Sequence, residues 1–351
     1  MSAERKRVLL LVGLGVAATA AAVLLIGQAV RYTELLRQLR TAAPGWLALC
    51  AVGETIAYGG FVVSYQAMAA VSGGPRLSAT IVVRVVGLSF GAFSIATAIG
   101  GLAVDFWALR EAGEPAGNAS ARVIGLETLR WAVLALATCA AGAAVLAGIA
   151  RPVTPVVPAA WLAVTGLCVA GGVAISAPGR RDRFTLGAGG PLRRALAVAV
   201  AGLVYIRQVL RGPRGPRRRA VGGAAVFWAG ELLCAWAALR AFGASVGLAP
   251  LILGYTTGYV ATGFPLPLGG AGSVDAALTG GFVLAGAPLS SALLAAVAFR
   301  VFSFWLPALA ALLSVATLSG LRKRLQAIAE ARRAALSGGA SELPAESRPR
   351  S

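Results

Sequence analysis

The sequence has no histidine, only two lysines, and few charged residues of any kind. Asp, Glu, Lys and Arg together make up 13% of the 351 positions, about half the share usual in soluble domains. Hydrophobic residues make up 58%. A water-soluble fold of this length needs far more polar surface, so the composition excludes soluble enzymes and soluble binding domains.

Motifs for metal, redox and nucleotide chemistry are also missing. Four cysteines stand singly within apolar stretches, and no C-x-x-C pair occurs. Without histidine, neither a zinc site nor a disulfide framework has support. The sequence has no Walker-type loop and no Asp-x-Asp pair. We therefore predict no catalytic residues, no metal and no cofactor, and any transport must be passive or driven by an ion gradient or the membrane potential.

What the sequence has in abundance is apolar runs of about twenty residues, separated by short stretches that contain Arg. The alternating pattern of a β-barrel is absent, and only helices or closed barrels satisfy their own backbone in lipid. The sequence thus predicts an all-α, polytopic transmembrane helical bundle. The candidate spans are roughly 8–30, 45–71, 78–99, 123–149, 154–177, 220–242, 248–266, 272–286 and 290–319.

The segments outside these spans have recognisable compositions. The apolar run 8–30 follows a basic start and is too long for a cleaved signal peptide, so we predict an uncleaved first helix. Segments 31–43 and Leu192–Leu210 are amphipathic and are predicted to lie at the membrane interface. The charged tail, 321–351, is predicted to be disordered in the cytoplasm.

The net charge of +19 is concentrated in one block. From Arg180 to Arg219 there are eleven arginines and one acid, Asp182. Aromatic residues do not interleave with them, so nucleic acid is not an expected partner. Such an excess is typical of cytoplasmic loops, and it attracts anionic lipid.

This charge pattern predicts a plasma-membrane protein with both termini in the cytoplasm. The organisation that we expect is a single transmembrane domain, 1–320, with halves 1–177 and 220–320 and a cytoplasmic basic loop, 178–219, that carries an interfacial helix.

The N-terminus, the basic loop 178–219 and the basic cluster Arg322–Arg324 should all lie on the cytoplasmic side. The number of crossings between any two of them should therefore be even. The second half satisfies this condition with four crossings, but the first half has five candidates, one too many. The weakest candidate is 78–99, which contains Arg84 and runs into Gly100 and Gly101. We therefore predict that 78–112 is broken or re-entrant, which leaves about eight spans.

The two halves also share a similar sequence pattern, which indicates a pseudo-repeat. In the first, Gly100 and Gly101 precede Asp105, and a span with Glu127 follows. In the second, a glycine-rich stretch precedes Asp275, and a span with Arg300 follows. Paired interruptions at corresponding places point to a transporter binding site.

Charged residues inside spans are costly, at roughly 2.5–3.5 kcal/mol each at a helix centre, and those that persist usually pair inside the bundle. Glu127 and Arg130 are three residues apart and can pair on one helix face. Glu231 needs a partner from another helix. Such charges either fix helix packing or bind a lipid phosphate, which suits a guanidinium. The full set is Glu54, Arg84, Glu127, Arg130, Glu231, Asp275 and Arg300.

The sharpest motif is the run Thr262–Asp275, which contains Pro265, Pro267, Gly269, Gly270 and Gly272. Prolines and glycines cannot continue a regular helix without freeing backbone groups. Free amides at the start of the next helix form an anion site, and a tight helix crossing is the structural alternative.

At these residues the chain resembles the transmembrane domain of lysylphosphatidylglycerol synthases and its stand-alone, flippase-like relatives. The family pattern is a Pro-containing Gly-Gly-x-Gly-x-x-Glu run, with an Arg about 25 residues later, here Arg300. Asp275 replaces the usual Glu, and Leu268 stands where Pro often precedes the glycines. In the family that this chain resembles, aminoacyl transfer belongs to an additional soluble domain. Since no such domain follows residue 320 in this sequence, we expect no synthase activity.

The resemblance implies a transporter that moves an anionic lipid or lipid-linked substrate between leaflets, with membrane lipids as partners and no enzymatic activity. Three alternatives stay open: an intramembrane enzyme acting on lipid phosphates, an ion-coupled small-molecule carrier, and a non-transporting accessory subunit. The predicted substrate-binding residues are Asp105, Glu127, Arg130, Glu231, Pro267, Gly269, Gly270, Gly272, Asp275 and Arg300.

Overall fold

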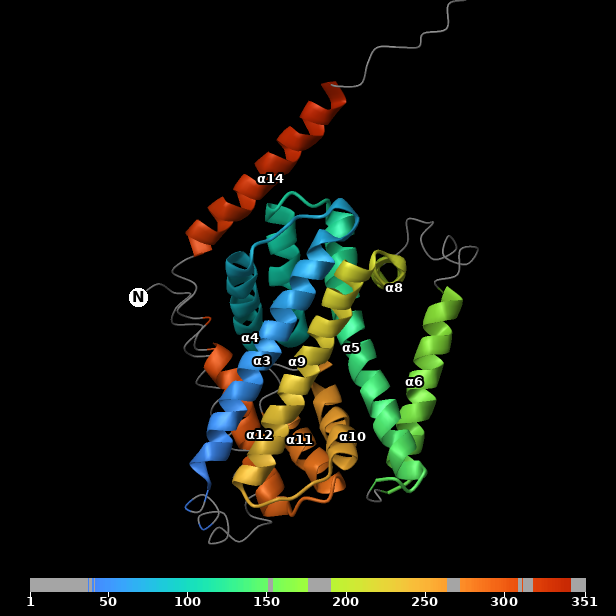
Figure 1. The fold of residues 1–351 in the computed structure, drawn as a ribbon, viewed down its shortest axis with the longest axis vertical. Coiled ribbons are helices and arrows are strands. Elements are labelled where there is room, and N and C mark those ends of the chain that lie inside the picture. Colours follow the sequence, from blue (N-terminus) through green and yellow to red (C-terminus); the bar gives the residue numbers. More distant parts are fainter. Residues whose placement is uncertain are drawn as a thin grey trace, which may run out of the picture.

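A computed structural model shows a bundle of long helices (Figure 1). It describes residues 37, 40, 42–150, 154–175, 191–263, 272–308, 311 and 318–341, without the side chains of 94–99, 191–196 and 336–341. Every regular element in this part of the chain is helical, as predicted. The predicted span 8–30 and nearly all of the interfacial segment 31–43 lie outside the described residues.

Five helices in the described part are long and apolar enough to cross a membrane. They support the predicted polytopic bundle. Their bounds are Pro44–Gly73, Ala116–Leu146, Val156–Ile175, Arg214–Ala241 and Leu289–Ala308.

The centre of the bundle is the antiparallel pair of α3 (Pro44–Ala70) and α9 (Arg214–Ala241). Glycines bring the two backbones into contact: a Cβ added at Gly60 would lie 2.4 Å from the Phe227 nitrogen. A Cβ at Gly230 would lie 2.4 Å from the Gly53 carbonyl oxygen. In lipid, where apolar burial gives little drive, such close packing is a main source of helix association.

Gly60→Ala should therefore destabilise the protein by about 1–3 kcal/mol, because backbone atoms of α9 cannot yield to the added methyl group. The adjacent Gly59 faces open space, so Gly59→Ala is the matched control and should leave stability unchanged or slightly raised. Thermal unfolding in detergent measures both. An equal loss of thermal stability in the two variants would show that the close contact between α3 and α9 does not determine stability.

The element α4 (Ala79–Glu111) doubles back on itself. A straight helix of this length would separate its ends by about 50 Å. Instead, the Arg332 guanidinium donates to the Gly73 carbonyl before α4 and to the Glu114 carboxylate after it. Near the tip, the Ser89 hydroxyl donates to the Gly101 carbonyl at 3.0 Å, although twelve residues separate them. Both limbs thus begin at one end of the bundle, so the break predicted within 78–112 is present, and re-entry into the membrane stays a prediction.

A second hairpin is formed by α10 (Leu248–Tyr259) and α11 (Ser273–Leu284). A Cβ on Gly254 would lie 2.2 Å from the Gly281 carbonyl oxygen, so the limbs pack in close contact. Each helix has 12 residues, about 18 Å of length, which is short of a hydrocarbon core of about 30 Å. The predicted spans 248–266 and 272–286 are therefore two limbs of a re-entrant pair. Neither limb is long enough to cross on its own, so the predicted count of about eight spans is too high by two. The parity argument is unaffected, because the chain returns to the same side.

The two hairpins enter from opposite ends of the bundle. The open end of the α10–α11 hairpin lies at the C-terminus of α9, where α12 (Leu289–Arg300) begins and Ser291 donates to the Phe242 carbonyl. The open end of α4 lies at the other end of α9. Beyond Arg300 the chain makes a π-helical turn, Val301–Trp305, a feature that often marks functional sites.

The remaining helices cover the side and one end of the bundle. Long α5 (Ala116–Leu146) runs beside α9, and α6 (Val156–Ile175) returns next to α5. Figure 1 shows α8 (Pro191–Arg211) nearly end-on, and thus across the bundle axis. This placement is the one predicted for an interfacial helix over Leu192–Leu210.

The C-terminal region differs from the prediction. Residues Leu318–Ser341 form helix α14, whereas we expected a disordered tail over 321–351. The reason is a stripe of apolar residues spaced four apart, Leu321, Leu325 and Ala329, which is buried although charges dominate the segment. Residues 342–351 lie outside the described residues.

A buried ion cluster joins four elements at the α14 end of the bundle. The Arg122 guanidinium binds the Glu114 carboxylate at 2.9 Å, and Arg332 of α14 binds its other oxygen at 3.0 Å. Arg122 also donates to the hydroxyl of Tyr205 on α8. Burial raises the pKa of Tyr205 to about 12, so this hydroxyl stays protonated and donates to the Met68 carbonyl. Sequence analysis did not anticipate this cluster.

Glu114→Gln should lower the free energy of unfolding by about 3–5 kcal/mol, because Arg122 loses its buried counter-charge. Glu111→Gln is the matched control: its partner Arg322 is 58% exposed, so the loss should stay below about 1 kcal/mol. Thermal unfolding in detergent checks the difference. Equal shifts for the two variants would contradict the structural role of Glu114.

Candidate functional site

A cavity of about 230 Å³ lies where the tips of the two hairpins meet. This volume is far above the roughly 10–15 Å³ needed for one water molecule. Ser89 and Gly101 of α4, Thr262 at the end of the α10 limb, and Val274 of α11 contribute to its wall. The apolar limbs Ala79–Phe93 and Ser273–Leu284 are too short to cross a hydrocarbon core of about 30 Å, so we infer that the tips of the hairpins end at membrane depth. The charged lining residues are Asp105, Glu127, Arg130, Glu231 and Arg300.

Arg300 is held by Asp275 from the second hairpin. Its Nε donates to Asp275 Oδ1 at 3.1 Å, and both side chains are at most 5% exposed. The other carboxylate oxygen accepts the backbone N–H of Gly272 at 2.8 Å, at the start of α11. Gly272 has φ +83°, a conformation that favours glycine, so the motif residue is needed for this turn. The guanidinium also lies 4.0 Å from the centre of the Phe304 ring.

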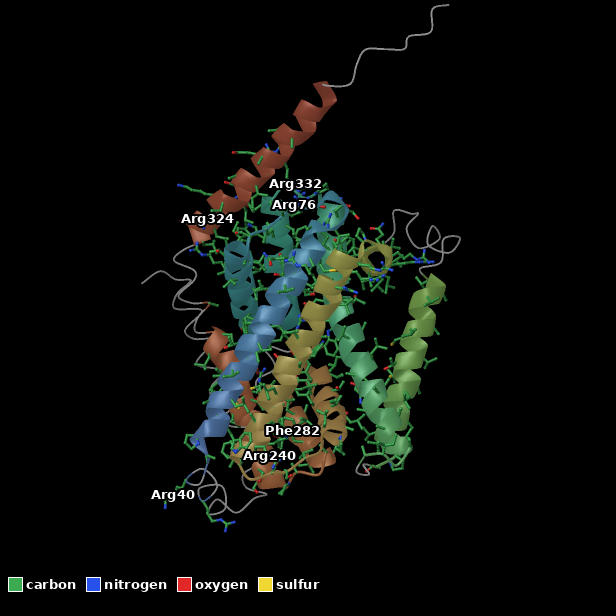
Figure 2. All side chains as sticks on the ribbon, viewed as in Figure 1. Arg40, Arg76, Arg240, Phe282, Arg324 and Arg332 are labelled. Carbon is green, nitrogen blue, oxygen red and sulfur yellow. The ribbon has the colours of Figure 1, made fainter. Side chains whose placement is uncertain are left out.

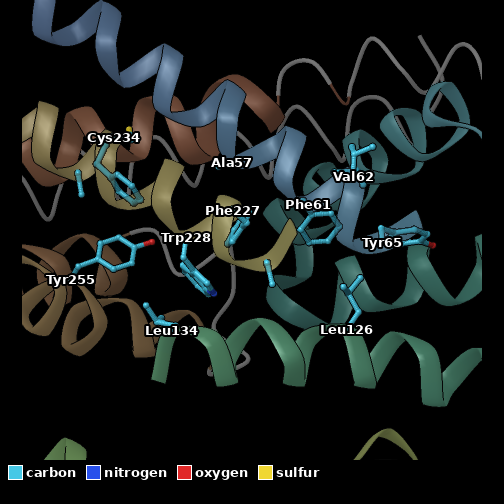
Figure 3. Packing of buried hydrophobic residues seen from close by; sticks show 14 of the residues in the cluster. Ala57, Phe61, Val62, Tyr65, Leu126, Leu134, Phe227, Trp228, Cys234 and Tyr255 are labelled. Carbon is cyan, nitrogen blue, oxygen red and sulfur yellow. The ribbon is translucent and has the colours of Figure 1, made fainter. Parts of the chain in front are cut away.

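Arg130 occupies an aromatic cage beside the cavity. Its guanidinium carbon lies 4.5 Å from the Phe61 ring centre and 4.0 Å from that of Phe227. Its Nη1 donates to Glu127 at 2.6 Å, which confirms the predicted pairing on one face of α5. The Trp228 indole donates to the Arg130 carbonyl at 2.7 Å and fixes the helix against α9. Figure 3 shows Phe61 of α3 close to Phe227 and Trp228 of α9. Cation–π contacts of this kind hold an arginine in place without neutralising it.

Two acids of the wall have no ion-pair partner among the described residues. Glu231 accepts a hydrogen bond from the Tyr255 hydroxyl at 2.7 Å. The partner from another helix that we predicted for Glu231 is therefore a tyrosine of α10. Asp105 is 3% exposed, and no group in the described part of the chain hydrogen-bonds its Oδ1. The cavity therefore presents both guanidinium groups and carboxyl groups with unused hydrogen-bonding capacity.

The structure brings most of the predicted binding residues together. Asp105, Glu127, Arg130, Glu231 and Arg300 line one cavity, although they come from four helices. Asp275 and Gly272 lie behind Arg300 and orient it. The predicted residues Pro267, Gly269 and Gly270 lie outside the described residues. Binding of a substrate by any of these groups stays a prediction.

Sequence reasoning missed the aromatic part of the site. Tyr255 and Tyr259 stack with ring centres 5.1 Å apart, and Trp131 and Trp228 pack against Tyr259. In an apolar sequence a single tryptophan or tyrosine carries no signal of its own. Their spacing relative to Arg130 and Glu231 arises only when α5, α9 and α10 pack together.

Taken together, the helices define a class: an integral membrane protein with two opposed re-entrant hairpins around a buried charged cavity. The family model of the lysylphosphatidylglycerol synthase TM region matches residues 10–311. The chain belongs to this family, as the motif around Asp275 and Arg300 predicted. A search of curated proteins finds no match.

Proposed function

We propose that this protein moves an anionic lipid, or a lipid-linked anionic substrate, between the leaflets of the plasma membrane. The observation that carries the proposal is the pair Arg130 and Arg300, two buried guanidinium groups on one cavity at the meeting point of two half-membrane hairpins. Transporters with broken helices place their substrate sites at such points. Guanidinium groups fit phosphate oxygens with directed, charge-assisted hydrogen bonds.

The acids beside the two arginines favour release of the substrate as well as binding. Glu127 and Asp275 bind the two guanidinium groups, and a phosphate entering the cavity competes with these carboxylates. A site that held two unpaired arginines would bind phosphate too tightly for rapid turnover. We infer transport without chemical change of the cargo, in which the head group crosses through the cavity and the acyl chains stay in the bilayer.

The orientation follows from the distribution of arginine. Arg76, Arg324 and Arg332 lie at the end of the bundle near α8 and α14, while Arg40 and Arg240 lie at the other (Figure 2). The arginines at the start of α9, within Arg214–Arg219, add to the first group. By the positive-inside rule we propose that this end faces the cytoplasm, together with both termini.

Reconstitution tests the proposal directly. Purified protein in liposomes that contain a fluorescent anionic phospholipid should speed its movement between leaflets at least about tenfold over protein-free liposomes, which corresponds to about 1.4 kcal/mol of barrier. A neutral fluorescent lipid should move more slowly than the anionic one. If the anionic lipid moved no faster with protein than without it, the proposal would be wrong.

A further inference from the structure

Two carboxylates flank the closest contact between α3 and α9. Glu54 follows Gly53, and Glu231 follows Gly230, whose added Cβ would lie 2.4 Å from the Gly53 carbonyl oxygen. Both glutamates are buried, with 6% and 3% exposure. Glu231 lines the cavity, and Glu54 lies on the neighbouring helix beyond its wall.

The two carboxylates have few partners. Within the described part of the chain, Glu54 Oε1 has no hydrogen-bond partner. Glu231 has the hydroxyl of Tyr255. Neither glutamate has an ion pair among the described residues, because Arg130 and Arg300 are bound to Glu127 and Asp275.

The surroundings of the pair consist mainly of proton-bearing, uncharged groups. From α3 come Cys50 and Tyr58, from α9 Cys234, from α10 Tyr255 and Tyr259, from α5 Arg130, and from α12 Arg300. The Tyr58 hydroxyl is buried and has no hydrogen-bond partner among the residues that the structure describes. Its ring packs 4.7 Å from that of Phe90, which lines the cavity. Tyr58 lies one helical turn after Glu54 on α3, so the two side chains share one face of that helix.

An ionised carboxylate inside a bilayer is costly unless a cation compensates it, and two neighbouring carboxylates cannot both ionise cheaply. Uptake of a proton by a carboxylate oxygen gives a neutral carboxyl group and removes this cost. Because Glu231 lines the cavity, water that enters the cavity can bring a proton to it and take one away.

We propose that Glu54 and Glu231 form a proton-binding pair that couples movement of an anionic cargo to movement of protons. The proposal rests on the proposed function. A proton bound at the pair accompanies the negative head group held by Arg130 and Arg300, so less net charge crosses the membrane. Release of the proton on the far side returns the pair to its starting state.

Infrared difference spectroscopy tests proton binding independently of transport. Wild-type protein in lipid at neutral pH should show the carbonyl stretch of protonated carboxyl groups, and this band should decrease in Glu54→Gln and shift in D₂O. Glu111→Gln, at a partly exposed site, is the matched control and should leave the band unchanged. A band that is identical in wild type and Glu54→Gln would overturn the proposal.

Coupling is tested in the same liposomes with an imposed pH gradient and clamped potential. With a gradient of about one pH unit, wild type should move the anionic lipid about five- to tenfold faster than without it. One proton that moves down such a gradient releases about 1.4 kcal/mol, which corresponds to a factor of about ten. Glu54→Gln should lose the acceleration by the gradient, while Glu54→Asp should retain it. If the wild-type transport rate were the same with and without the pH gradient, coupling to protons would be wrong and the proposed function would stand. If the wild type moved no lipid at all, both proposals would be wrong.

Discussion

Arg300→Ala should lower the rate of anionic-lipid translocation about ten- to a hundredfold. A hydrogen bond from a buried charged donor contributes about 1.5–3 kcal/mol, and each 1.4 kcal/mol corresponds to about a factor of ten. Arg300 is 4% exposed and lines the cavity, so water cannot replace its contact with a head group. The measurement is the initial rate of translocation in liposomes at equal protein content.

Loss of folding must be separated from loss of transport, because Arg300→Ala leaves Asp275 buried without its counter-charge. Such a change costs about 3–5 kcal/mol of stability. The double variant Arg300→Gln with Asp275→Asn removes both charges. Its new asparagine side chain needs no cation, and the amide oxygen can still accept the Gly272 N–H. We expect this variant to regain thermal stability and to stay slow in transport. Recovery of both properties would show that Arg300 serves packing alone.

Arg130→Ala should weaken binding of the anionic lipid about tenfold or more and slow its translocation to a similar extent, by the same charge-assisted hydrogen-bond energy. The guanidinium lies over the rings of both Phe61 and Phe227, and its planar form suits this packing. Arg130→Lys keeps the charge without the planar donor set, so we expect an intermediate loss. Titration of the lipid against intrinsic tryptophan fluorescence reports binding, since Trp228 donates to the Arg130 carbonyl.

The control for Arg130 is Arg240→Ala. Arg240 also lies over an aromatic ring, Trp236, at 5.3 Å, but at the far end of α9, away from the cavity. Its loss should leave lipid affinity unchanged. Equal weakening by both substitutions would mean that total positive charge, and not the cavity, determines binding.

Much of the architecture could be predicted because bilayer physics leaves few choices. Apolar length predicted the five long spans of the described residues but took the two short limbs α10 and α11 for full crossings. Parity with the glycines near residue 100 predicted the doubling back of α4. The pairing of Glu127 with Arg130 followed from helical spacing alone. The cavity could be anticipated in outline, because a buried charge in a span must face other polar groups.

Other features depend on long-range packing that no local pattern encodes. The Tyr255 hydroxyl reaches Glu231 only because α10 stops at half depth and lies against α9. The Glu114–Arg122 pair joins residues eight apart across the end of a helix, and its third member, Arg332, comes from 218 residues away. The α14 helix was missed because its charge obscured a narrow apolar stripe. In each case the stabilising contacts join different helices, so no local sequence pattern reports them.

The central claim is that an anionic lipid head group enters the cavity between the two hairpins. Photocross-linking measures this directly, with an anionic phospholipid whose head group carries a photoreactive label, applied to the reconstituted protein and followed by mass spectrometry of the peptides. We predict label on the α4 tip near Asp105 and on the π-helical turn after Arg300, and competition by unlabelled anionic lipid. Label confined to the outer surfaces of α6 and α8, with none at the cavity, would contradict the account.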